Sequence, residues 1–376
     1  MRVGITSNVL DKQGGISRYV SELAERFSRE HEIHLLSAKV NYAVRGTVIH
    51  KSRIIWHPTS LKVATSAYVN TNVGRKLKRE GIVELMHGQG VEYLRPDVVT
   101  AHSCQKAAVS QMRLVRGGIY DMLKPFEPTS NIVMAIEKLN VAPDGCKRII
   151  AVSEGVKREL MDLYGVAQER VTSIPNGVDL EEFNPSMRAE YRLPVRGRLG
   201  VREGQVLLVF TAWEFKRKGL RHIIEALPHL PDDVKLAAVG GEDPTPYRNL
   251  AERLGVKDRV IFTGHSKNVK EYYAAADAFV FPTAYEAFSL STLEAAASGL
   301  PVIATKVNGT EELIEDGYNG HFIERDGKDI ADKVKKAMGY GLERMGANAR
   351  KTAEGFSWER TAEQTLKIYR EALETR

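Results

Sequence analysis

Two glutamates in the segment AYEAFSLSTLEAAASGLPV could carry chemistry, because Glu286 and Glu294 stand eight positions apart among apolar and small residues. Two neighbouring carboxylates are typical of a general acid and base pair. The phase of a helix argues against that pairing. If a helix begins near Leu290, its apolar stripe holds Leu290 and Leu293, and Glu294 falls inside the same stripe. We therefore expect the two carboxylates to act separately.

Glu286 precedes this helix and lies on the loop after the predicted strand AFVFPT (278–283). A buried carboxylate such as Glu294 needs partners, because desolvating it alone is costly. The helix starts at Ser289, and backbone N–H groups at a helix N-terminus attract anions. This pattern predicts a nucleotide whose phosphates lie at Ser289 and Leu290. Its diol hydroxyls would bind Glu294, and a more distant group would bind Glu286.

A basic turn, FKRKGL (215–220), follows the first strand of the second half and precedes a helix. Lys218 acts as a point charge, and the guanidinium of Arg217 can bind two oxygens of one anion. We expect Arg217 and Lys218 to bind a phosphate. A basic surface turn is the alternative.

Three residues of the first half are further candidates. Gly14 and Gly15 follow the first strand and precede a helix, where glycine lets the backbone approach a ligand. No G-x-G-x-x-G is present, and an ordinary glycine turn is the alternative. His102 ends the predicted strand DVVTAH (97–102), where a side chain can face a ligand. A structural role is the alternative for His102, and His87 is a competing candidate.

The second half alternates short apolar strands with amphipathic helices. The predicted strands span 205–212, 234–241, 259–264, 278–283 and 301–305, and the predicted helices span 220–230, 247–255, 269–276 and 290–299. Short buried strands separated by helices require parallel pairing, with helices over both faces of the sheet. The second half is therefore predicted to be a doubly wound α/β domain.

The first half repeats this pattern less regularly. Its predicted strands span 2–7, 32–38, 82–87, 97–102, 148–153 and 170–175, and its predicted helices span 16–30 and, with breaks at prolines, 104–142. We predict an α/β fold of two Rossmann-like doubly wound domains that face a cleft. The predicted boundaries are 1–184 for the first domain, 185–204 for a linker and 205–357 for the second domain. A C-terminal helix at 358–376 could dock on either domain.

Composition limits the classes of function. The chain is 43% hydrophobic and 27% charged, as in globular proteins, and no apolar run approaches the roughly 18 residues of a membrane span. Cys104 and Cys146 lack metal-ligand spacing and are expected to be ordinary thiols of a cytoplasmic protein. The net charge of +6 suggests phosphorylated ligands, an anionic membrane or nucleic acid. The basic clusters are short and lack the interleaved aromatics of a nucleic-acid groove.

Several motifs, in their order and spacing, make the chain resemble the retaining glycosyltransferases of family 4, near the lipopolysaccharide-core type. EAFSLSTLE resembles the family's E-x7-E motif, and FKRKGL resembles its basic turn. IPNGVDLEEF (174–183) resembles its PNGVD segment, and VVTAH resembles the strand that ends in its active-site histidine. GGISRYV and FSWER resemble its N-terminal glycine loop and the turn into its C-terminal helix. The resemblance implies the GT-B fold of two Rossmann-like domains.

The resemblance implies a role for each residue of the E-x7-E motif and the basic turn. Glu294 would bind the ribose hydroxyls of the nucleotide, and Glu286 would contact the transferred sugar. Lys218 and Arg217 would neutralise the diphosphate leaving group.

The resemblance also extends to the first domain and to the base. His102 would lie beside the reacting sugar, and Gly15, next to Gly14, would lie near the donor phosphates and the acceptor. His265 and Ser266 in GHSKN would border the base. The C-terminal helix would return to the first domain.

The sequence departs from the family pattern at two positions. Ala212 stands where many members have an arginine after the first strand of the second domain, and Arg217 would take over its role. Ser289 stands where the family usually has glycine, which predicts altered donor contacts. The stretches 42–80 and 104–145 match least, and this region normally shapes the acceptor site.

The resemblance implies a retaining hexosyltransferase that uses no metal, because the sequence has no D-x-D motif and the basic turn can replace a metal. No cofactor is expected beyond a UDP-, GDP- or ADP-sugar donor. The acceptor is expected to be a hydroxyl of a glycan or of a lipid-linked glycan. The basic stretch GRKLKRE (74–80) suggests peripheral contact with the inner face of an anionic membrane.

Two other functions are alternatives. A sugar-nucleotide epimerase or hydrolase would share the two-domain architecture, although the PNGVD and E-x7-E motifs together argue against it. A non-catalytic protein that binds nucleic acid or a membrane surface would account for the charge of +6, which alone is poor evidence of function. We expect no nucleic-acid partner.

Overall fold

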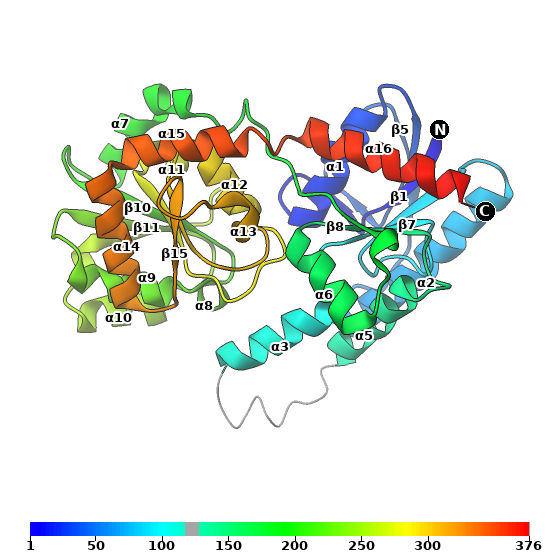
Figure 1. Ribbon diagram of the computed structural model, residues 1–376, viewed down its shortest axis with the longest axis horizontal. Coiled ribbons are helices and arrows are strands. Elements are labelled where there is room, and N and C mark those ends of the chain that lie inside the picture. The colour runs from blue at the N-terminus through cyan, green and yellow to red at the C-terminus, as the bar shows by residue number, and fades with distance from the viewer. Residues whose placement is uncertain (117–127, 376) are drawn as a thin grey trace. The chain divides into compact units, whose positions relative to one another are not determined.

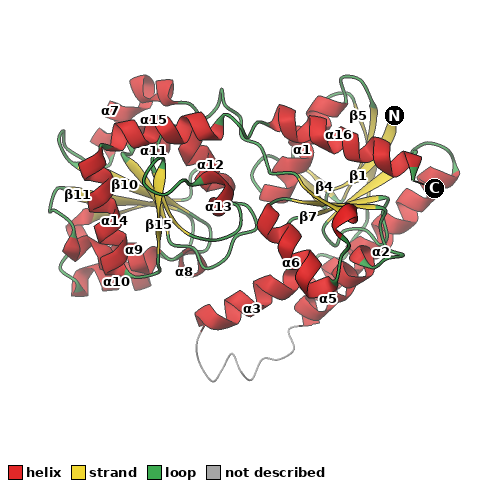
Figure 2. Cartoon of the chain, viewed as in Figure 1, coloured by secondary structure: helices red, strands yellow, loops and turns green. Residues whose placement is uncertain are grey.

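The computed structural model describes residues 1–116 and 128–375, which form two units (Figure 1). Unit 1 comprises residues 1–177 and the C-terminal helix from Trp358, and unit 2 comprises residues 178–357. Each unit is a parallel β-sheet covered by helices (Figure 2). The two doubly wound α/β halves predicted from the sequence are confirmed.

Unit 1 is built on a seven-stranded parallel sheet with the strand order β5-β3-β1-β6-β7-β8-β9. The strands are β1 (Arg2–Thr6), β3 (Glu32–Ser37), β5 (Thr47–Lys51), β6 (Leu85–Gln89), β7 (Val98–Ala101), β8 (Arg148–Ala151) and β9 (Val171–Ser173), and β2 (Val9–Leu10) pairs with β4 (Lys39–Val40). The helices are α1 (Gly15–Phe27), α2 (Thr59–Arg79), α3 (Gln105–Arg116), α5 (Pro128–Val141), α6 (Glu154–Tyr164), the 3₁₀ turn η1 (Gln168–Arg170) and α16 (Trp358–Glu374). The sequence did not predict β5, the short strands β2 and β4, or the helices α2 and α6. Within the described residues, no helix combines the length and apolar character that crossing a membrane requires.

Unit 2 is built on a six-stranded parallel sheet with the strand order β12-β11-β10-β13-β14-β15. The strands are β10 (Val206–Thr211), β11 (Val234–Val239), β12 (Val260–Gly264), β13 (Ala278–Phe281), β14 (Val302–Thr305) and β15 (Gly320–Ile323). The helices are α7 (Arg188–Arg198), α8 (Phe215–Lys218), α9 (Leu220–Ala226), α10 (Thr245–Arg253), α11 (Lys270–Ala275), α12 (Leu290–Ala297), α13 (Thr310–Leu313), α14 (Gly327–Tyr340) and α15 (Leu342–Ala353), with 3₁₀ turns η2 (Pro185–Met187), η3 (Leu227–His229) and η4 (Lys257–Arg259). The five strands predicted from the sequence are present, and β15 adds a sixth at the edge.

Each sheet reverses its strand order once, between β1 and β6 in unit 1 and between β10 and β13 in unit 2. At such a point, the loops that leave neighbouring strands turn to opposite faces of the sheet and leave space beyond the carboxyl ends. Ligands of open α/β sheets bind there. The loops after β1, β6, β10 and β13 are therefore where functional side chains should lie.

The C-terminal helix α16 packs in unit 1 beside α1, as Figure 1 shows in red and blue. The hydroxyl of Tyr369 on α16 lies 2.7 Å from Nδ1 of His87, a buried residue of β6. At the surface, Arg26 Nε donates a 2.9 Å hydrogen bond to Glu359 Oε1. These contacts join the last helix to the N-terminal half of the chain.

The segment expected to be a linker, 185–204, is structured and belongs to unit 2. Three of its arginines, Arg188, Arg192 and Arg196, stand at i, i+4 and i+8 on α7, so they share one face. Arg192 Nη2 and Arg196 Nη1 bind the two carboxylate oxygens of Asp277 at 2.6 and 3.0 Å, and Arg188 Nη2 donates to the carbonyl oxygen of Ala276 at 2.8 Å. The arginine content suggested a solvated linker, but these side chains bind the end of α11 and the start of β13.

Replacing Arg196 with alanine should lower the free energy of unfolding of unit 2 by about 3 kcal/mol. The change leaves Asp277 with Arg192 as its remaining cation and removes the buried donors of two backbone carbonyl oxygens. Urea unfolding followed by circular dichroism measures this change. The matched control is Arg198→Ala on the same helix, which removes an exposed pair with Glu271 and should cost less than about 1 kcal/mol. Equal costs for the two variants would contradict the structural role of the Arg196 pair.

Candidate functional site

The basic turn of unit 2 packs directly against the loop that follows β13. The helix α8 ends at Lys218, and Gly219 follows with φ of +86°, a conformation that L side chains rarely adopt. A Cβ atom at Gly219 would lie 2.1 Å from the carbonyl oxygen of Pro282. Only glycine permits this approach, which brings Lys218 to the loop that carries Glu286.

Lys218, Arg217 and Glu286 are in direct contact. Lys218 Nζ donates to Glu286 Oε1, and Arg217 Nη1 lies 3.3 Å from the same oxygen. Thr283 Oγ1 also donates to this oxygen, at 2.8 Å. The carbonyl oxygen of Tyr285 accepts from Arg217 Nη1 at 2.9 Å, which fixes the guanidinium across the loop. The structure thus brings together the basic turn and the first glutamate of the E-x7-E motif, which the sequence singled out as separate motifs.

The two cations of this cluster have carboxylate partners within unit 2. Glu286 is buried and Lys218 is largely buried. Burial lowers the pKa of Lys218, while the carboxylate of Glu286 opposes this shift. Arg217 also pairs with the exposed Glu214. Across the described ranges, no group of three or more His, Cys, Asp or Glu side chains is arranged to hold a metal ion.

Ser289 caps the helix α12, which begins at Leu290. Its hydroxyl oxygen accepts hydrogen bonds from Thr292 N at 3.2 Å and from Thr292 Oγ1 at 2.8 Å. Its φ of −83° is open to any residue, so replacing the glycine usual in the family creates no backbone strain here. The serine hydroxyl therefore stabilises the start of the helix.

Glu294 is buried and held toward the end of β10. The hydroxyl of Tyr273 lies 3.5 Å from Glu294 Oε2 and 2.9 Å from Oγ1 of Thr211, the last residue of that strand. Glu286 instead contacts the basic turn. The two carboxylates thus have different partners, as the helical phase indicates.

An exposed pair of rings lies at the carboxyl ends of β10 and β12. The ring of His265 stacks on that of Trp213, with centroids 4.7 Å apart, and Trp213 is 64% exposed. A Cβ atom at Gly241 would lie 3.3 Å from the Trp213 ring, so the end of β11 leaves room for the indole. Beside this pair, Ser266 Oγ accepts a hydrogen bond from Asn268 N at 3.1 Å. Trp213 was not predicted from the sequence, although a large aromatic residue directly after a buried strand is a usable signal.

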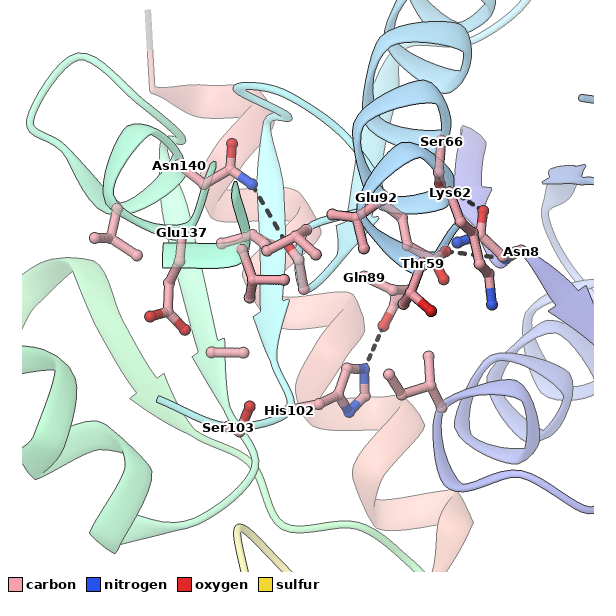
Figure 3. Close-up of a pocket in the computed structure, with 18 residues that line it drawn as sticks. Asn8, Thr59, Lys62, Ser66, Gln89, Glu92, His102, Ser103, Glu137 and Asn140 are labelled. Carbon is pink, nitrogen blue, oxygen red and sulfur yellow. Dashed lines mark hydrogen bonds between the residues drawn. The ribbon is translucent and has the colours of Figure 1, made fainter. Parts of the chain in front are cut away.

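Unit 1 contains a pocket of about 250 Å³ at the carboxyl ends of β6 and β7, with walls from α2 and α5 (Figure 3). Its apolar lining includes Ile16, Val63, Val99, Val133 and Val141. Its polar side chains include Lys62, Gln89, Glu92, His102 and Glu137. The pocket therefore combines an apolar wall with a few hydrogen-bonding groups, as small-molecule sites do.

His102, rather than His87, faces this pocket. Nε2 of His102 donates to Gln89 Oε1 at 2.8 Å (Figure 3), and burial lowers the pKa of His102 to about 3. Both ring nitrogens of His87 have hydrogen-bond partners in the core. Nδ1 lies 2.7 Å from Tyr369 Oη, and Nε2 lies 2.7 Å from Thr100 Oγ1. His87 is thus structural, and His102 is a neutral ring beside the pocket.

Gly14 and Gly15 start α1 next to Ile16, which lines the pocket. Gly14 has φ of −87°, so this position does not require glycine for its backbone conformation. A Cβ atom at Gly15 would meet no other atom within 4 Å. The carboxylate of Asp11, which the sequence analysis did not single out, orders this loop by accepting from Gly14 N at 3.2 Å.

Glu92 lies at the other side of the pocket, on the loop after β6 (Figure 3). Burial raises its pKa to about 7, and the opposing effects of a hydrogen bond from Asn8 N, at 3.0 Å, and of the charge of Lys62 are smaller. The carboxyl group is therefore near the midpoint of its titration at neutral pH. The sequence contained a signal for Glu92, since it follows the predicted strand 82–87 closely.

Two family models match most of the chain. The model described as Glycosyl transferases group 1 matches residues 194–352, and the model described as Glycosyltransferase Family 4 matches residues 13–182. A glycosyltransferase of Methanocaldococcus jannaschii is 27% identical, over 96% of this chain and 95% of its own length.

Solved structures share the fold. WaaG, a glycosyltransferase involved in lipopolysaccharide biosynthesis, has a TM-score of 0.80 at 24% identity, over 97% of this chain and 99% of its own. HepE of Anabaena, crystallised with UDP-glucose, has a TM-score of 0.71 at 17% identity, over 98% and 99% of the two chains. At these identities the similarity shows the fold, which is GT-B.

Replacing Glu92 with glutamine should raise the free energy of unfolding at pH 8 by on the order of 1–3 kcal/mol and leave it unchanged at pH 4. Between the ordinary glutamate pKa and about 7, the native wild-type protein holds a proton that the unfolded chain has released. Its stability therefore falls as pH rises through this window, and the amide removes this fall while still accepting from Asn8 N.

Thermal and urea unfolding at several pH values measure this difference. The exposed Glu80, replaced with glutamine, is the control and should change the free energy by less than about 0.5 kcal/mol at each pH. Parallel pH profiles for wild type and Glu92→Gln would contradict the raised pKa.

Proposed function

The chain belongs to the glycosyltransferases that these two family models describe, and on this premise we propose the course of its reaction. A nucleoside diphosphate sugar binds unit 2, and its sugar moves to an acceptor hydroxyl with retention of anomeric configuration. The observation that supports this most is the contact of Lys218 and Arg217 with Glu286 at the point where the strand order of unit 2 reverses. A diphosphate needs cations, a sugar needs a hydrogen-bonding carboxylate, and both are adjacent there.

In this proposal, Lys218 and Arg217 stabilise the departing diphosphate. Charge develops on the leaving oxygen as its bond to the anomeric carbon breaks, and a fixed charge or donor at that oxygen is worth about 10²–10³ in rate. Backbone N–H groups at Ser289 and Leu290, at the positive end of the α12 dipole, also stabilise the diphosphate. Glu286 accepts hydrogen bonds from hydroxyls of the transferred sugar. No resident metal is required for these roles.

The nucleoside is proposed to bind between Glu294 and the exposed rings of Trp213 and His265. Glu294 accepts from the ribose hydroxyls. The base stacks on Trp213, because an exposed aromatic face at the ligand end of a sheet offers roughly 1–3 kcal/mol per stacked base. Uridine donors are the first to examine, since HepE, which shares the fold, was crystallised with UDP-glucose.

The acceptor is proposed to bind the pocket of unit 1, where His102 offers a neutral ring. Gly15, next to the pocket residue Ile16, leaves open space beside it. The low pKa makes His102 a poor base at neutral pH. The acceptor proton therefore passes to an oxygen of the departing phosphate on the same face of the sugar. The bond from the anomeric carbon to the phosphate oxygen breaks as the bond to the acceptor oxygen forms, which gives retention.

A screen of UDP-, GDP- and ADP-sugars by thermal shift should identify one stabilising donor, because a ligand at 100 times its dissociation constant adds about 2.7 kcal/mol. With that donor and a panel of glycan and lipid-linked acceptors, we expect transfer that persists in EDTA. Nuclear magnetic resonance of the product should show the anomeric configuration of the donor.

Each outcome of this assay bears on a separate part of the proposal. Free sugar or an epimer formed without any acceptor would favour the hydrolase or epimerase alternative. An inverted product would contradict retention, and loss of transfer in EDTA would contradict metal independence.

Replacing Lys218 with alanine should lower kcat by about 10²-fold, because the leaving group loses its nearest cation. Steady-state kinetics with the identified donor measure this loss, and a melting curve checks that the variant folds. Lys216→Ala, which removes an exposed lysine two residues away in α8, is the matched control and should retain wild-type kcat. Equal activity of the Lys218 variant and the control would overturn the leaving-group role.

A further inference from the structure

The positive charge of the chain is concentrated in one stretch of unit 1. Residues 33–79 contain nine Lys and Arg and no Asp or Glu. The other 329 residues hold 45 Lys and Arg against 48 Asp and Glu, so they are net negative. The net charge of +6 therefore arises from the stretch that covers β5, the following loop and the whole of α2.

Large apolar side chains are exposed in the same stretch. Ile55 is 49% exposed, Leu61 45% and Tyr68 66%, and Trp56 is also exposed. Single exposed apolar side chains are ordinary, but four within 14 residues next to unbalanced cations are not. A surface of this composition is expected to bind a partner.

The loop before α2 is fixed against the helix by one contact on its outward face and one on its flank. Ile55 N donates to Thr65 Oγ1 at 3.1 Å, and Lys62 Nζ lies 4.9 Å from the centre of the Trp56 ring. Leu61, Thr65 and Tyr68 are spaced i, i+4 and i+7, so they share one face of α2. The exposed apolar groups therefore form one surface rather than a scattered set.

This surface continues along α2 as a basic strip. Arg75 and Arg79 stand at i+14 and i+18 from Leu61, on the same face, and both are exposed. The other cations of GRKLKRE are less available, because Lys78 pairs with Asp97 at 2.7 Å and Lys76 lies 3.8 Å from Glu80. The outward face thus has an apolar first half and a cationic second half. We call it, with residues 53–58, the α2 face.

We propose that the α2 face docks unit 1 on an anionic lipid surface. Tryptophan and tyrosine prefer the interface between water and lipid, and Ile55 and Leu61 can enter the acyl boundary beside them. Each cation near a surface that carries anionic lipid raises the partition coefficient of the protein onto that surface about fivefold. A protein partner of matching acidic surface would have to cover aromatic and aliphatic side chains as well, and a bilayer offers both chemistries without a matched shape.

The opposite face of α2 lines the pocket of unit 1. Thr59, Lys62, Val63 and Ser66 contribute to that pocket and are spaced i, i+3, i+4 and i+7 (Figure 3). One helix thus separates the proposed lipid surface from the proposed acceptor pocket. A consequence follows, which rests on the proposed function: the acceptor is a lipid-linked molecule that the enzyme takes from the same lipid surface.

Co-sedimentation with vesicles tests the docking without any sugar transfer. The wild-type protein should bind vesicles of phosphatidylcholine with about one third phosphatidylglycerol at least tenfold better than phosphatidylcholine alone, and less as salt rises. The variant Ile55→Ala/Trp56→Ala should lose about tenfold in binding to both. Arg75→Glu/Arg79→Glu should lose the preference for anionic lipid. All four side chains are exposed, and melting curves check that the variants fold.

The matched control is Leu193→Ala/Arg198→Glu in unit 2, which changes an exposed apolar residue and an exposed cation and should bind vesicles as wild type. Equal binding to neutral and anionic vesicles, or unchanged binding of both α2-face variants, would overturn the proposal. The proposal would also be overturned if the wild-type protein bound no vesicles and instead self-associated or bound RNA in a way that these variants abolish. Transfer to a water-soluble acceptor should stay unchanged in the α2-face variants, so failure of docking and failure of the proposed function are distinguishable.

Discussion

The parallel pairing of the strands is the constraint on which the rest of the structure depends. Parallel strands must be joined by crossover segments, and in both units these are mostly helices that cover the sheet. The sheet faces are thereby committed to apolar packing, and polar chemistry is left to the loops at the carboxyl ends. The cation cluster of unit 2 and the pocket of unit 1 both lie at such ends, next to a reversal of strand order.

The strands of unit 2 were predictable because their composition follows their burial. All four residues of β13 are buried and apolar, so a short apolar run between turn residues identified the strand. The stretch that holds α2 behaves differently, since it buries Asn70 and Thr71 and exposes Leu61 and Tyr68. Because polarity does not follow burial in this stretch, its hydrophobic periodicity did not predict α2. The same mismatch marks the face that we propose to dock on lipid.

The sequence singled out most residues of the candidate site, but it did not predict their contacts. E-x7-E and the basic turn pointed to Glu286 and Lys218, whereas their direct contact depends on the positive φ of Gly219 and its fit against Pro282. No local pattern encodes a contact across 68 positions. Trp213 was missed for another reason, because an aromatic residue near a strand is ordinarily assigned to the core.

The carboxylate of Glu286 has a consequence for which anions can bind at Lys218. A free phosphate that approaches Lys218 has to displace an internal counter-ion that is already largely desolvated, and it offers Glu286 at most one or two P–O–H groups in return. A diphosphate joined to a sugar occupies the cations and offers hydroxyls to the displaced carboxylate. In the proposed function, the pair therefore favours a ligand that carries both a diphosphate and sugar hydroxyls over a ligand that carries either group alone.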